Sequence, residues 1–152
     1  MFPQISNDNE REVLNFSNNP PKSNKRSSWK IAKDLPTSFL YAAKGLRYAF
    51  STQRNFRIHV GFALVAFVLG LFLGLNKSDL AIMSLTATSV LVLELINTAI
   101  ESVVDLAIGK RFHPLAQIAK DCSAGAVLVA SISSLLIAVL LLFPPMLKNL
   151  GI

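Results

Sequence analysis

The feature that most constrains this sequence is an apolar stretch that contains acidic side chains. Residues 79–108 read DLAIMSLTATSVLVLELINTAIESVVDLAI, a membrane-helix composition interrupted by Glu94, Asn97, Glu101 and Asp105. On a helix these four side chains lie within roughly an 80° arc, stacked along about 16 Å. An ionised acid at the centre of a bilayer costs roughly 2.5–3.5 kcal/mol, so such residues normally face a partner or a water-filled site. We interpret this acidic stripe as a binding site; a polar seam that only joins helices is the alternative.

The composition indicates a small all-α integral membrane protein. The chain has 152 residues, 52% of them hydrophobic, and these are concentrated in its last two thirds. The net charge is +6, but most of it precedes the first apolar span. Anionic lipid explains such a distribution better than nucleic acid does. The single Cys122 cannot form an internal disulfide and is interpreted as a small buried residue.

We expect a disordered basic tail over residues 1–34 and one membrane domain over residues 35–152. Within the domain, an amphipathic interfacial helix precedes three transmembrane helices, and glycines on the first span would permit close packing. Ser78 is a plausible N-cap, Gly109 a natural stop and Pro114 a first-turn residue. The predicted helices cover residues 36–52, 57–75, 79–108 and 114–143, the last ending before Pro144 and Pro145.

The basic residues predict the orientation in a plasma membrane. Ten of the fifteen Lys and Arg residues precede the first span, and only Lys77 and Lys148 remain for the opposite side. This bias predicts a cytoplasmic N-terminus and a cytoplasmic loop at residues 109–120. The acidic stripe then opens toward the cytosol.

The basic segment that follows the acidic stripe limits the reactions that the stripe could support. Carboxylates at a membrane boundary could relay protons, bind a transported cation, or hold magnesium for phosphoryl transfer. Lys110, Arg111, His113 and Lys120 gather positive charge beside the acids, which suits a magnesium–nucleotide complex better than a conducted cation. Glu94 is separated from the metal end and could serve as a general base. These patterns support a site for a cation and a phosphate, and they leave the substrate open.

Several segments resemble the small prokaryotic diacylglycerol kinase and undecaprenol kinase family. They are ELINTAIESVVD (94–105), HPLAQIAKDCSAGAV (113–127), KGLRYAF (44–50) and RNFRIH (54–59). The resemblance covers residues 36–143. It implies a homotrimer of three-span subunits in the bilayer, with active sites between subunits that transfer the γ-phosphate of Mg·ATP to a lipid alcohol.

The resemblance also implies residue roles. Glu94 resembles the catalytic base, Asn97 a residue that holds the acceptor or the γ-phosphate, and Glu101 a magnesium ligand. The residues matching nucleotide-binding positions, or flanking them, are Tyr41, Asp105, Arg111, Phe112, His113, Lys120 and Asp121. An interfacial aromatic and a helix-capping histidine are the alternatives for Tyr41 and His113.

One position departs from the family pattern. Gln53 stands where a second metal-binding glutamate is usual, and its amide oxygen can still ligate Mg²⁺ but brings no charge. His59 matches a position that is acidic in diacylglycerol kinases and often histidine in undecaprenol kinases. Both lipids therefore stay open as acceptors. A non-catalytic trimer, ion-conducting or structural, is the alternative function, although it would have no use for Lys120 and Asp121.

Overall fold

The computed structural model describes residues 35–109 and 111–151, and these form helices without strands. The predicted tail over residues 1–34 lies outside the described residues. The chain divides into two compact units, residues 1–41 and 42–152, so the boundary falls inside the first described helix. The helices are α2 (Leu35–Thr52), α3 (Arg54–Phe72), α4 (Lys77–Ile108) and α5 (Pro114–Leu150).

The helices α3, α4 and α5 are each long and apolar enough to cross a membrane, which confirms the predicted all-helical membrane fold. Their surfaces agree with this, because large apolar side chains such as Leu128, Ile132 and Leu136 on α5 are exposed. In water such a surface would be strongly unfavourable, whereas lipid tails solvate it.

The first span begins earlier than predicted. Gln53 alone separates α2 from α3, and Arg57 from the first turn of α3 donates to the carbonyls of Phe50 and Ser51, at 3.1 and 3.2 Å. These carbonyls belong to the last turn of α2, where intrahelical donors run out. Arg57 therefore fixes the junction that carries Gln53.

The turn between α3 and α4 corrects the predicted N-cap. Gly74 adopts a positive φ of 73°, and α4 begins at Lys77 with Asn76, not Ser78, as its cap. The Asn76 side chain accepts from the Asp79 amide at 2.9 Å and donates to the Asp79 carboxylate at 2.7 Å. Asn76 is favoured because its amide both accepts and donates, whereas Ser78 is already the second residue of the helix and so cannot cap it.

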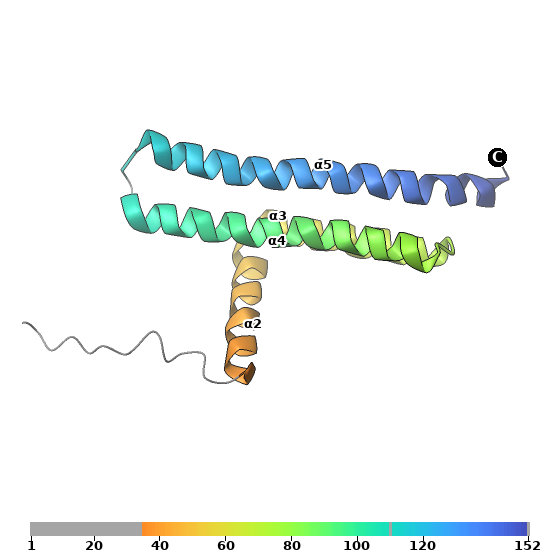
Figure 1. Ribbon diagram of the computed structural model, residues 1–152, viewed down its shortest axis with the longest axis horizontal. Coiled ribbons are helices and arrows are strands. Elements are labelled where there is room, and N and C mark those ends of the chain that lie inside the picture. Colours follow the sequence, from red (N-terminus) through yellow and green to blue (C-terminus); the bar gives the residue numbers. More distant parts are fainter. Residues whose placement is uncertain (1–34, 110, 152) are drawn as a thin grey trace, which may run out of the picture. The chain divides into compact units, whose positions relative to one another are not determined.

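The helices α4 and α5 run antiparallel, side by side (Figure 1). Gly109 ends α4 with a φ of 60°, and Pro114 occupies the first turn of α5, so both predictions are confirmed. His113 caps α5, since its Nδ1 accepts from the Leu115 amide at 3.3 Å. The short connection brings the end of the acidic stripe next to the start of α5.

The last helix contradicts one prediction, because α5 continues through Pro144 and Pro145 to Leu150 and ends at Gly151. Each proline removes one backbone donor. In an apolar surrounding, ending the helix there would leave more backbone groups unpaired than the two lost bonds do. The continued helix is therefore the better solution.

Close packing between α3 and α4 centres on one glycine. A Cβ added at Gly70 would lie 2.8 Å from Met83 Cε and 3.2 Å from Leu80 Cδ2. Gly61 is another of the first-span glycines that were expected to permit close packing, and no atom of the described chain lies within 4 Å of a Cβ added there. Of these two glycines, Gly70 is therefore the one that the contact between α3 and α4 requires.

Candidate functional site

The acidic stripe lies on α4 as predicted, and it is graded from buried to exposed. Glu94 is only 3% exposed, Asn97 and Glu101 are half-buried, and the Asp105 side chain is 61% exposed. The helical period stacks these side chains on one face. The stripe therefore joins a buried carboxyl to the helix end near the basic loop.

Asn97 connects the stripe to α5. Its Nδ2 donates to Glu101 Oε1 at 3.3 Å, one turn along the same helix. Its Oδ1 accepts from Ser123 Oγ of α5 at 2.6 Å. The amide therefore has a partner at each end, which fixes its orientation.

Lys120 forms the second polar contact between the two helices. Its Nζ pairs with Asp105 Oδ1 at 2.5 Å, and the side chains are 37% and 61% exposed. A pair this exposed is worth at most about 1 kcal/mol. Lys120 can therefore exchange Asp105 for an anionic ligand at small cost.

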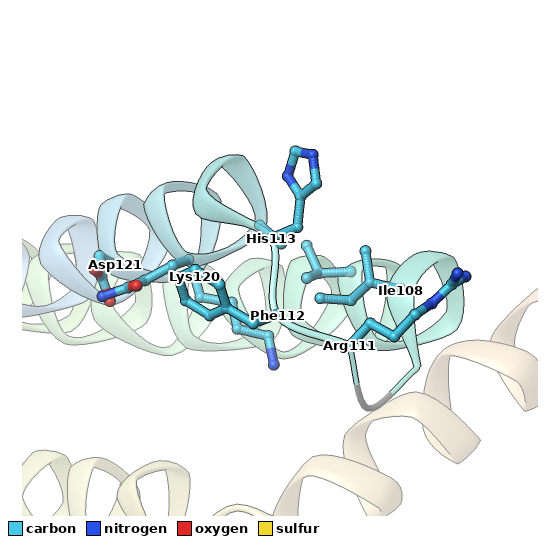
Figure 2. Close-up of a pocket in the computed structure, with 9 residues that line it drawn as sticks. Ile108, Arg111, Phe112, His113, Lys120 and Asp121 are labelled. Atoms are coloured by element: carbon cyan, nitrogen blue, oxygen red, sulfur yellow. The ribbon is translucent and has the colours of Figure 1, made fainter.

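A shallow cavity of about 270 Å³ lies where α4 ends and α5 begins (Figure 2). Side chains from both helices and the loop between them form its wall. In Figure 2, Arg111 and His113 point in different directions from this loop. The lining residues are Val104, Ile108, Arg111, Phe112, His113, Ala116, Gln117, Lys120 and Asp121. The structure therefore brings together all the predicted nucleotide-contacting residues except Asp105, which is paired with Lys120, and Tyr41.

His113 carries two roles, because it lines this cavity through one surface and caps α5 through Nδ1. The capping alternative raised from the sequence is thus confirmed. Because Nδ1 accepts the capping hydrogen bond, Nε2 carries the proton of the neutral ring and can act as a donor. Tyr41 lies on α2 in the first compact unit, and its side chain is exposed.

Gln53 occupies the N-cap position of α3, where its backbone is extended with a φ of −95° and a ψ of 112°. Its side chain makes no capping hydrogen bond there. The position of Gln53 between α2 and α3 is held by Arg57, whereas Glu101 lies half-buried on α4.

A family model, prokaryotic diacylglycerol kinase, matches residues 40–142. Three similar proteins cover most of this chain. The diacylglycerol kinase of Synechocystis is 47% identical over 124 residues, covering 82% of this chain and 71% of the relative. The undecaprenol kinase of Bacillus subtilis is 39% identical over 107 residues, covering 70% and 86%. The diacylglycerol kinase of Escherichia coli is 34% identical over 103 residues, covering 68% and 84%.

The chain belongs to the prokaryotic diacylglycerol kinase family. The matched segment runs from before Tyr41 to beyond Asp121, so it contains every candidate residue named from the sequence. The family membership that the sequence motifs predicted is thereby confirmed. The kinase family also favours a catalytic site over a scaffold that only retains the fold.

The oxygen ligands available in this kinase fit magnesium. No group of three His, Cys, Asp or Glu side chains that could hold a metal occurs within residues 35–109 and 111–151. Magnesium does not require such a cage, since it is usually bound by one or two carboxylates together with waters and substrate phosphates. The Glu101 carboxylate and the Gln53 amide oxygen are hard donors of the required type.

Sequence reasoning missed Ser123, which is buried on α5 and contacts Asn97. A signal for it existed, because Ser123 follows Lys120 by three residues and therefore shares its helix face. It also missed Gln117, a polar side chain of the cavity wall. The residues that α5 contributes to the site therefore lie along the helix face that carries Lys120, and they extend beyond the motif around Lys120 and Asp121.

Proposed function

We propose that this membrane lipid kinase transfers the γ-phosphate of Mg·ATP to a lipid alcohol at the cytosolic surface of the plasma membrane. The observation that carries the proposal is the graded stripe, with a buried Glu94 at one end and the Asp105–Lys120 pair beside the basic cavity at the other. The lipid substrate lies in the membrane and the nucleotide lies in water. The buried end of the stripe can therefore receive the lipid, and the exposed end can receive the nucleotide.

The proposed chemistry assigns each side chain one task. Glu94 accepts the proton of the lipid hydroxyl while the oxygen of that hydroxyl attacks the γ-phosphorus in line. The bond from that phosphorus to the β,γ-bridging oxygen breaks, and ADP leaves with the electron pair. Lys120 neutralises phosphate charge after releasing Asp105, and Asn97 orients the acceptor or the γ-phosphate.

The cavity wall supports a nucleotide end of the site. Arg111, Lys120 and His113 offer donors to phosphate, and the Phe112 ring offers a flat apolar surface to a base. Asp121, which also lines the cavity, and Tyr41 are proposed as nucleotide contacts because they match nucleotide-binding positions of the family. Magnesium, when bound, would neutralise phosphate oxygens, with Glu101 and Gln53 as its protein ligands.

We propose a homotrimer as the active form. The cavity of about 270 Å³ is below the usual size of a ligand site, which is roughly 300–1,000 Å³. The chain also buries few apolar side chains by itself: Ala49, Phe56, Met83, Val90 and Val127 are the buried ones among the described residues. A neighbouring subunit would add wall to the cavity and cover apolar helix faces.

A phosphotransfer assay tests the function and the acceptor together. The purified protein in mixed micelles with Mg·ATP is given diacylglycerol, undecaprenol or no lipid. Because relatives of both kinds match the chain, the assay decides which alcohol is phosphorylated. Labelled phosphate in an organic-soluble product with either lipid supports the proposal, and none with both lipids contradicts it.

Orientation is a separate prediction of the basic bias, with the N-terminus and residues 109–120 in the cytoplasm and Asn76 and Ile152 outside. In a Cys122→Ser background, Asn76→Cys should react with an impermeant thiol reagent in intact cells. Gln117→Cys in the same background should react only after permeabilisation. The reverse pattern would show that the orientation is wrong.

A further inference from the structure

Ser123 is a buried polar side chain on the face of α5 that meets α4. Its Oγ lies 2.6 Å from Asn97 Oδ1 and 2.9 Å from the carbonyl oxygen of Lys120. Both partners are acceptors, so the serine hydroxyl is the donor in each case. Its single hydrogen is thus shared between the Asn97 amide and the backbone of its own helix.

The hydroxyl decides which way the Asn97 amide points. With Oδ1 accepting from Ser123, Nδ2 is directed at Glu101 Oε1, 3.3 Å away. Reversing the amide would place two acceptor oxygens, Asn97 Oδ1 and Glu101 Oε1, against each other. Without the hydroxyl, Asn97 Oδ1 would lose its donor at a part-buried position, which is unfavourable.

We propose that Ser123 is a positioning residue for phosphoryl transfer, acting through Asn97, an inference that rests on the proposed function. It keeps the Asn97 NH₂ group on the Glu101 side of the stripe, where that group donates to a phosphate oxygen. Ser123 lies one turn after Lys120 on α5. The same helix turn therefore sets both the lysine that binds phosphates and the amide that orients the transferred group.

The test compares Ser123→Ala and Ser123→Thr with the wild-type chain in the micelle assay. Ser131→Ala is the matched control, because the Ser131 hydroxyl bonds Val127 O within α5, at 2.8 Å, and does not reach another helix. We expect Ser123→Ala to lower kcat about five- to ten-fold, the size of one lost hydrogen bond in the transition state. The KM for ATP should change less than about two-fold, since Lys120 is untouched. Ser123→Thr, which restores the hydroxyl, should recover most of kcat, and Ser131→Ala should match wild type.

A double-mutant cycle measured by thermal unfolding supplies a readout that does not need activity. Ser123→Ala and Asn97→Ala should lower the midpoint by less together than the sum of their separate effects, because either change removes the same contact. Additive midpoints, a wild-type kcat for Ser123→Ala, or a Thr variant as slow as the Ala variant would overturn the inference. A wild-type chain that phosphorylates neither lipid overturns the proposed function instead, and the cycle still decides on the Ser123–Asn97 contact.

Discussion

The two halves of α4 hold their neighbours by different means. In the half that starts at Lys77, α4 packs against α3 through Met83 and Leu80 around Gly70, a contact of apolar surfaces. In the half that ends at Ile108, it contacts α5 through Asn97–Ser123 and Asp105–Lys120. The first contact depends on shape, and the second depends on hydrogen bonds and charge.

This difference separates stability from chemistry along one helix. In lipid, apolar surfaces gain little from the hydrophobic effect, so close packing at a small residue supplies the attraction. The polar half places hydrogen-bonding groups where a ligand can compete for them. Changes in the polar half should therefore alter turnover or ligand affinity, whereas changes in the glycine contact should alter stability.

The largest effect is expected at the buried end of the stripe. Glu94→Gln removes the proposed base and should lower kcat by at least about 10²-fold, with little change in the KM for ATP. The assay is lipid phosphorylation at saturating Mg·ATP. Asp79→Asn, on the other end of α4, is the control and should keep wild-type kcat. A Glu94→Gln variant with more than about a tenth of wild-type kcat would rule out a single general base.

The second-largest effect is expected from removing Lys120, the basic partner of the exposed ion pair, and it should appear in the affinity for the nucleotide. Lys120→Ala should raise the KM for ATP about ten-fold or more, because a hydrogen bond to a charged phosphate is lost. It should change the free energy of unfolding by less than about 1 kcal/mol, since the pair with Asp105 is exposed. Lys148→Ala, at the far end of α5, is the control for charge alone. An unchanged KM would remove Lys120 from the nucleotide site.

A smaller effect, on the magnesium dependence of activity, is expected from changes at Gln53, a proposed magnesium ligand. Gln53→Glu adds a charged oxygen to the proposed magnesium site and should lower the Mg²⁺ concentration for half-maximal activity, on the order of three-fold. Gln53→Ala should raise it, with little change in the lipid KM. A magnesium titration of the three proteins measures both shifts, and superimposable curves would contradict a metal role for Gln53.

The smallest effect on turnover is expected at the glycine contact. Gly70→Leu overpacks the site against Met83 and should lower the free energy of unfolding by about 1–3 kcal/mol. The kcat per folded molecule should stay within about two-fold of wild type. Gly61→Leu is the comparison, because no atom of the described chain lies near its added Cβ. A loss of kcat in Gly70→Leu at full stability would show that the two halves of α4 are not separable.

Much of the fold could be predicted from local patterns. Gly109 and Pro114 marked the turn between α4 and α5 because their backbone preferences act within a few residues. Pro144 and Pro145 misled the same reasoning. Proline signals the end of a helix in water, but an apolar surrounding penalises unpaired backbone more, and α5 continues.

The spacing of Glu94, Asn97, Glu101 and Asp105 was enough to place them on one helix face, since the period of the α-helix relates positions within an element. The contacts of Asn97 with Ser123 and of Asp105 with Lys120 could be found only from the folded chain. Those contacts depend on the rotation and register of α5 against α4. Both are set by side-chain packing over the whole length of the helices, which no local motif records.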